Sequence, residues 1–160
     1  MDKTKEEYRA EGMIAQHTTV ERFRKRFDPE IYDVIESEGG SDRDCLDKVD
    51  ITVINKITGE IREYDVKSSK KDEDSDTDVS YTYQNGNNEK SLIFKKQFHV
   101  DLIYTFDDND IAYIVSAADF YKILLDRIRN NMSKPGKFNQ NSRYIMVSRQ
   151  EIIDMAYDTF

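Results

Sequence analysis

Apolar and polar positions alternate along residues 49–54 and again along residues 61–67, and both segments are rich in β-branched side chains. This pattern predicts two β-strands, each with one apolar face. Residues 56–59 form the loop between them, and Gly59 supplies a site for positive φ at the end of the turn. We therefore predict a β-hairpin around which the rest of the chain is organised.

The loop length sets the register of this hairpin. Asp50 is expected opposite Asp65, and Lys67 lies on the same face two residues further along. The other face carries Val49, Ile51 and Val53 on one strand against Arg62, Tyr64 and Val66 on the next. Like charges directly opposite each other destabilise a sheet. A cation between the two carboxylates would remove that repulsion.

Two interpretations of the acidic pair stay open. Carboxylate oxygens are the ligands that Mg²⁺ and Mn²⁺ prefer, so Asp50 and Asp65 are candidate metal ligands, with Lys67 neutralising charge or positioning a water. Alternatively, the pair belongs to a plain exposed sheet face on which Lys67 only screens the two acids. Asp44 and Asp47 are rival ligands, but only Asp50 faces Asp65 in the register that also gathers the apolar side chains.

The periodicity of the remaining chain predicts an α/β fold with a mixed central β-sheet flanked by helices. A first helix is expected over residues 4–27, although a capping box at 18–21 would break it near Thr18. Further strands are expected at 31–35, 79–83, 99–106, 111–115 and 143–147. Ser116 and Ser148 are expected to cap two later helices, and the hairpin over 99–115 is expected to complete the sheet.

Length and composition predict one domain spanning residues 1–160. No apolar run approaches the roughly 18 residues of a membrane span, and the N-terminus does not resemble a signal peptide. The single cysteine, Cys45, excludes an internal disulfide and favours a reducing, cytoplasmic location. The acidic run at 72–78 lacks the glycine and glutamate positions of a calcium loop, so we interpret it as a solvated loop.

The formal net charge of −8 is unusual for a protein that binds phosphate backbones. Basic residues do cluster locally, at 22–26, at 95–96 and at Lys134 with Lys137. The total charge therefore argues against a tight grip on long duplex DNA without excluding a nucleic-acid substrate.

The spacing of Asp50, fourteen intervening residues and then Asp65-Val66-Lys67 resembles the signature of the PD-(D/E)xK nuclease superfamily. The intervening turn also resembles the catalytic hairpin of that family. Val49 stands where the family usually has proline. The resemblance covers roughly the first two-thirds of the chain and implies a restriction-endonuclease-like fold.

This resemblance implies a DNA endonuclease that uses Mg²⁺ or Mn²⁺ to hydrolyse phosphodiester bonds. It implies that Asp50, Asp65 and the backbone carbonyl of Val66 hold the metal, and that Lys67 orients water or stabilises charge on the phosphate. Relatives often add an acid from the first helix, which makes Glu21, or else Glu6, a further candidate metal ligand; alternatively, both are ordinary surface acids. A phage or mobile element is the source we expect.

The acidic surface favours a second hypothesis, in which the chain is a catalytically weak or inactive nuclease-fold module that binds or inhibits a protein partner. A third hypothesis is a homodimeric enzyme whose basic channel forms only across two chains. A metal-dependent nicking assay, co-elution with a basic protein and sizing in solution distinguish the three.

Overall fold

The computed structural model describes residues 3–39, 41, 47–69, 78–86, 89–106, 110–136 and 139–160. These residues form an α/β structure with two sheets, so the predicted fold class of a mixed central sheet flanked by helices is confirmed. The central sheet has six strands in the order β1 (Tyr32–Glu36), β2 (Ile51–Asn55), β3 (Ile61–Ser69), β6 (Val100–Phe106), β7 (Ala112–Val115) and β10 (Ala156–Thr159). Strands β3 and β6 are parallel, and the other neighbouring pairs in this sheet are antiparallel.

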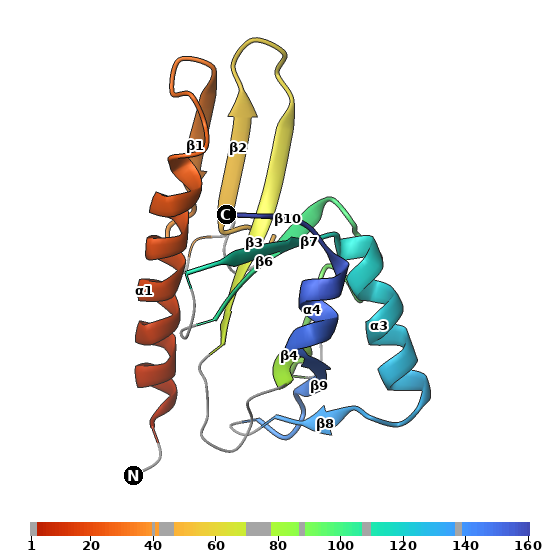
Figure 1. The fold of residues 1–160 in the computed structure, drawn as a ribbon. Helices are drawn as coiled ribbons and strands as arrows, with labels where there is room; N and C mark the ends of the chain where they lie inside the picture. Colours follow the sequence, from red (N-terminus) through yellow and green to blue (C-terminus); the bar gives the residue numbers. More distant parts are fainter. Residues whose placement is uncertain are drawn as a thin grey trace.

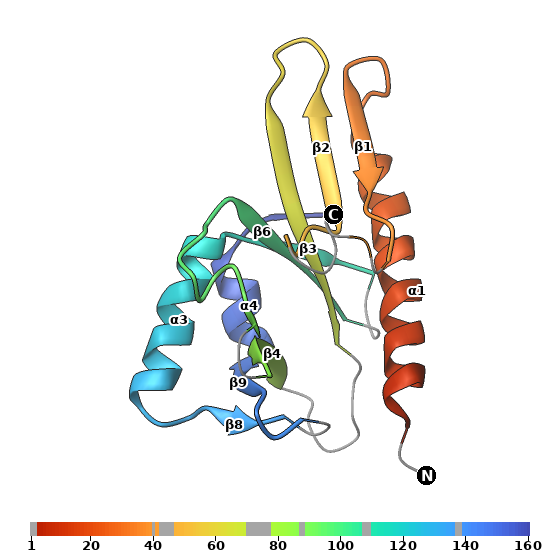
Figure 2. The same ribbon diagram turned by 180° about the vertical axis from the view of Figure 1, so that it is seen from behind.

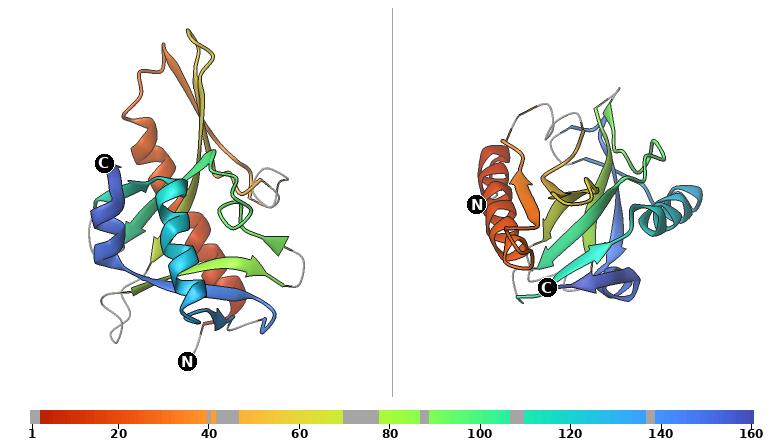
Figure 3. Two further views of the ribbon diagram at one scale, coloured as in Figure 1. Left: turned by 90° about the vertical axis from the view of Figure 1, so that its right-hand side faces the viewer. Right: turned by 90° about the horizontal axis from the view of Figure 1, so that it is seen from above.

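The second sheet has four strands in the order β5 (Glu89–Lys90), β4 (Asp78–Asn85), β9 (Arg143–Ser148) and β8 (Lys134–Pro135). Helix α1 (Lys5–Arg24) lies on one side of β1–β3, whereas α3 (Ala117–Arg129), α4 (Arg149–Met155) and the second sheet lie on the other side (Figures 1 and 2). The view from above in Figure 3 shows the same order, with the strands of the central sheet between α1 and α3.

The predicted hairpin has the expected register. Ile54 pairs with Ile61 and Ile51 pairs with Tyr64, and Gly59 adopts a φ of 75° at the end of the turn. Its side chains divide between two layers because neighbouring residues in a strand point to opposite faces. One face of the hairpin therefore packs into the core under α1, and its other face is turned towards the second sheet.

One residue of the hairpin departs from the prediction. Val49 was expected beside Ile51 and Val53, but it packs in a separate cluster with Leu92 and Val100. Strand pairing begins only at Ile51, and Lys48, three residues before it in the chain, has a φ of 55°. The strict alternation of a strand therefore does not extend back to Val49.

Helix α1 is one continuous helix, so the predicted break near Thr18 is wrong. The capping box lies at its true start instead, where the Thr4 hydroxyl accepts a hydrogen bond from the backbone N–H of Glu7 and the Glu7 carboxylate accepts one from that of Thr4. Towards its C-terminal end, Val20 and Phe23 are buried against the central sheet. By contrast, Met13 in its middle is 51% exposed, so only the later turns anchor the helix.

The core on the other side of the central sheet is shared by both sheets and two helices. Phe120 and Leu124 of α3, Ile152 of α4 and Ile145 of β9 are all fully buried there. Ser116 and Ser148 cap α3 and α4, as predicted. The prediction that the hairpin over 99–115 completes the central sheet is wrong, because β10 adds a further strand beyond β7.

No helix among the described residues has the length and apolar character that crossing a bilayer requires.

Candidate functional site

The two acids singled out in the sequence lie beside each other at the edge where β2 begins. The backbone N–H of Asp50 donates to the carbonyl of Tyr64 (N···O 2.9 Å), the residue that Ile51 faces, so the regular β2–β3 pairing ends at Ile51 and Asp50 lies just beyond it, next to Asp65. The carbonyl of Asp50 accepts from the N–H of Ser37 (2.9 Å). The strand on each side therefore holds the backbone of Asp50 in place.

The carboxylate of Asp50 turns towards β3. Its Oδ2 accepts a hydrogen bond from the backbone N–H of Val66 at 2.7 Å. Asp50 is only 6% exposed and Asp65 only 9% exposed. Burial raises the pKa of Asp50 to about 8, and the negative charge of Asp65 raises it in the same direction, whereas Lys67 and the Val66 N–H act to lower it. Two carboxylates are thus held together with little water to screen them.

Lys67 supplies the positive charge beside this pair. Its ammonium group donates to Oδ1 of Asp65 at 2.8 Å, as expected for side chains two residues apart on the same face of a strand. Burial acts to lower the pKa of Lys67, but the nearby negative charges, chiefly that of Asp65, outweigh it and raise this pKa above its ordinary value. Lys67 therefore stays protonated at neutral pH and acts as a donor and a positive charge, not as a base.

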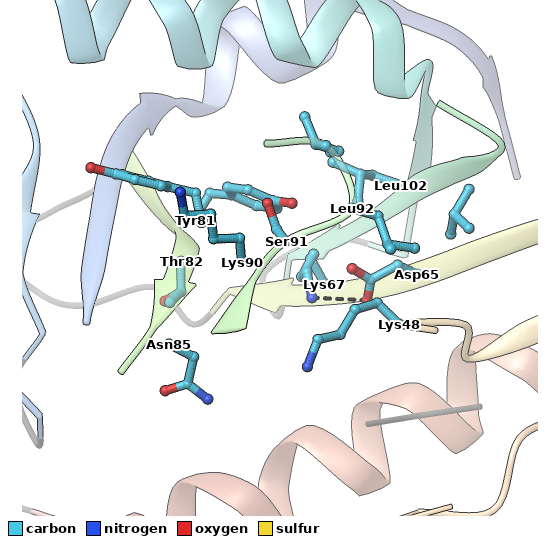
Figure 4. Close-up of a pocket in the computed structure, with 13 residues that line it drawn as sticks. Lys48, Asp65, Lys67, Tyr81, Thr82, Asn85, Lys90, Ser91, Leu92 and Leu102 are labelled. Atoms are coloured by element: carbon cyan, nitrogen blue, oxygen red, sulfur yellow. Dashed lines mark hydrogen bonds and ion pairs between the residues drawn. The ribbon is translucent and has the colours of Figure 1, made fainter. Parts of the chain in front are cut away.

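Two cavities meet at Asp65 and Lys67. The first, of about 380 Å³, lies between α1 and the ends of the strands, and Asp50 lines it. The second, of about 290 Å³, lies on the side of the second sheet. Lys48, Asp65 and Lys67 line both cavities. Figure 4 shows the second cavity, with the Lys67–Asp65 ion pair at its floor and Lys48 beside it.

The donors at this site fit a hard divalent cation. The N–H and C=O of one strand residue point to the same side, so the carbonyl of Val66 faces the side on which its N–H meets Asp50. Two carboxylates and one carbonyl are oxygen ligands of the kind that Mg²⁺ and Mn²⁺ take. Within the described ranges, no group of three or more His, Cys, Asp or Glu side chains is arranged to hold a metal. Because Mg²⁺ keeps several waters and needs only one or two carboxylates, this donor set still suits it.

The structure does not bring Glu21, the predicted helix ligand, to the cavity that Asp50 and Asp65 line. Glu21 forms an ion pair with Arg24 and lines a different surface depression together with Pro29 and Val34. The part of α1 that borders the acidic pair lies one to three turns earlier, at Arg9, Gly12, Met13 and Gln16. Glu6, the alternative, is exposed and does not line the cavity of Asp50 either.

A carboxylate that the sequence did not single out lies nearer. Glu36, one residue beyond the strand predicted at 31–35, is the last residue of β1, and it lines the same cavity as Asp50 and Asp65. Its Oε2 lies 2.9 Å from Nδ1 of His17, and this contact raises the pKa of His17. The signal that could have found Glu36 is its pairing with Ile51, the residue after Asp50, which requires the β1–β2 register.

Of the rival ligands, Asp47 lines neither cavity, and Asp44 lies outside the described residues, as do Cys45 and Lys137. A scan against protein-family models matches none to this chain, and a search of the curated proteins finds no match to its sequence. The case for a function therefore depends on the geometry of the site.

Proposed function

We propose that this protein is a metal-dependent nuclease with a restriction-endonuclease-like fold that hydrolyses phosphodiester bonds in DNA. The observation that carries the proposal is the convergence of Asp50, Asp65 and Lys67: two buried carboxylates adjoin each other, and an ammonium group contacts one of them. A site for structure alone gains nothing from burying two carboxyl groups side by side, since the charged form of each is disfavoured there. A divalent ion bound between them would stabilise their charged forms.

In this proposal Asp50, Asp65 and the Val66 carbonyl hold Mg²⁺ or Mn²⁺. When bound, the ion supplies positive charge that polarises the phosphate and makes a nearby water more acidic. The residues of the chain divide the remaining work. The N–H of Val66 fixes the orientation of the Asp50 carboxylate at 2.7 Å, and Lys67, which stays protonated, donates to the phosphate oxygen on which charge develops.

Local charge supports an anionic substrate despite the acidic total. Arg9 borders the first cavity, Lys90 borders the second, and Lys48 and Lys67 border both. Cations around a concave site attract phosphate even when the net charge of the protein is −8. The basic side chains are thus gathered where the proposed reaction needs them.

The net charge favours one second candidate, a binding module that uses this fold to block a basic protein partner without cleaving DNA. Such a module would have no use for buried carboxylates beside a lysine. Its complex with a basic partner would dissociate as salt is raised, and substitution of Asp65 would leave that complex intact.

The first test is a cleavage assay on supercoiled plasmid and on labelled single-stranded and duplex oligonucleotides, with Mg²⁺, Mn²⁺ or EDTA. We expect cleavage only with metal, and we expect Asp65→Asn to lower the rate by about 1000-fold or more, as loss of a principal electrostatic group does. Asp47→Asn is the matched control, because Asp47 is an acid near the same strand that lines neither cavity. Equal activity of the two variants, or cleavage in EDTA, would refute the proposal.

A further inference from the structure

The second cavity has one charged end and one apolar wall. Its floor is the Asp65–Lys67 ion pair, which the proposed function places at the scissile phosphate. The residues that line its apolar part are Tyr81, Tyr83, Leu92, Ile93, Val100 and Leu102. All six are less than 10% exposed, so they form a rigid wall that belongs to the core. A flexible surface groove would not have this property.

Polar and basic groups complete the rest of the lining. Ser91 and Asn85 offer a hydroxyl and an amide, and Lys48 and Lys90 add positive charge to that of Lys67. Figure 4 shows Ser91 between the tyrosine of β4 and the ion pair, with Asn85 and Lys90 on the side of the second sheet. An apolar wall with a few polar groups and a cationic rim is the lining expected for a flat heterocycle that carries a phosphate.

The size of the cavity restricts what can enter it. A volume of about 290 Å³ is at the lower end of the range for small-molecule pockets and accommodates one nucleoside-sized group. A base pair inside a duplex cannot reach such a recess, because its bases are stacked and their faces are covered. Only a nucleotide that is already single-stranded, or that leaves the stack, can place its base there.

We propose that this cavity is a base-binding subsite, which receives one unstacked base beside the scissile phosphate and so directs the enzyme to single-stranded or locally unpaired DNA. The inference rests on the proposed function, which places a phosphate at Asp65 and Lys67. It also accounts for the acidic total charge, since a protein that grips one inserted base needs fewer phosphate contacts than one that grips a long duplex.

The test measures binding in EDTA, where no cleavage is required. Fluorescein-labelled 12-nucleotide single strands carry either 2-aminopurine or an abasic site at successive positions, and the matching duplex and a duplex with one unpaired base are compared with them. We expect single strands and the unpaired duplex to bind about tenfold or more tightly than the full duplex, and one abasic position to weaken binding about tenfold. The 2-aminopurine signal should change at that same position.

Two pairs of variants locate the effect. Lys90→Ala should weaken single-strand binding by about fivefold or more, whereas Lys95→Ala, which removes another exposed lysine outside the cavity, should not. Thr82→Trp narrows the cavity from an exposed position and should abolish the 2-aminopurine change, whereas Ser80→Trp on the same strand, outside the cavity lining, should preserve it.

The outcomes separate this inference from the proposed function. Cleavage of full duplex with no abasic effect would overturn the base subsite and leave the nuclease proposal standing. A position-specific abasic effect without any metal-dependent cleavage would overturn the nuclease proposal and support the subsite. Equal effects of Lys90→Ala and Lys95→Ala, or full-duplex binding as tight as that of single strands, would also refute the subsite.

Discussion

The two cavities that share Asp65 and Lys67 differ sharply in what surrounds them. Towards α1, the lining is polar and includes Asp50, Glu36 and Arg9. Towards the second sheet, a wall of apolar and aromatic side chains joins the polar and basic ones. The same two side chains thus face a charged compartment on one side and a compartment with an apolar wall on the other.

This contrast indicates a division of work along a bound strand. A divalent ion and a phosphate need oxygen donors and cations, which the compartment beside α1 supplies. A base needs flat apolar contacts with a few hydrogen-bonding groups, which the compartment between the sheets supplies. Lys67 lies where the two compartments meet. Its ammonium group can therefore contact the phosphate, which joins the metal-binding part of a bound strand to the base.

The largest predicted effect tests the charged compartment through Asp50. The folded protein raises the pKa of Asp50 from 3.8 to about 8, so the fold favours the protonated form. The resulting stability is fully present below pH 4 and is lost as the pH rises towards 8. Each pKa unit is worth about 1.4 kcal/mol, so Asp50→Asn should gain on the order of 5 kcal/mol relative to wild type above pH 8.

Urea unfolding between pH 5 and pH 9 measures this difference, with Asp47→Asn as the control. We expect the advantage of Asp50→Asn to grow with pH without metal, and to shrink when Mg²⁺ is added, because only the wild type retains the full ligand set. A constant difference across this pH range would contradict the burial of an ionisable pair at this edge of the sheet.

The next effect concerns the shared lysine. Lys67→Met keeps the length of the side chain but removes the ammonium group that contacts Asp65 at 2.8 Å. We expect the cleavage rate to fall by about 100- to 1000-fold, because charge developing on the phosphate loses its donor. Lys67→Arg should retain part of the rate, since the charge remains but its geometry changes. A rate for Lys67→Met equal to that of wild type would remove Lys67 from the proposed mechanism.

The charged compartment was predictable from the sequence where its residues are close together in the chain. A short loop fixes the β2–β3 register, so the alternation of side chains along β3 is enough to place Asp65 and Lys67 on one face. Asp50 lies beyond the last regular pair and reaches this site through its hydrogen bonds with Tyr64 and Val66. The same local argument found the helix caps at Ser116 and Ser148. It failed at Val49, where the backbone leaves the strand before the pattern of residue types changes.

The inter-sheet compartment could not be predicted in the same way, because its walls come from segments far apart in the chain. Tyr81 is followed by a turn and by Leu92, and it pairs with Ile145 across more than 60 residues. No local periodicity specifies such a pairing. The misplacement of Glu21 has a related cause: helix periodicity identifies a face of α1 but not which turn of that face lies over β3.

The smallest predicted effect tests whether water is excluded from the wall of the compartment between the two sheets. Tyr104 pairs with Lys67 in the β3–β6 ladder and is 1% exposed, and its hydroxyl has no hydrogen-bond partner among the described residues. A buried unsatisfied hydroxyl is costly, so Tyr104→Phe should stabilise the protein by about 1 kcal/mol. The urea midpoint should rise at an unchanged m-value.

Tyr81→Phe is the matched control: burial raises the pKa of Tyr81, and Ser91 acts on its hydroxyl to lower this pKa, so removing the hydroxyl should destabilise the protein by about 1 kcal/mol. If Tyr104→Phe stabilises the protein and Tyr81→Phe destabilises it, the part of the wall from which water is excluded includes Tyr104 and ends before Tyr81. Tyr81 is on the side of the cavity where the base is expected to insert. Destabilisation by Tyr104→Phe would mean that water reaches the Tyr104 hydroxyl. The two compartments would then differ less in polarity, and the apolar wall would offer a base less hydrophobic contact than the geometry implies.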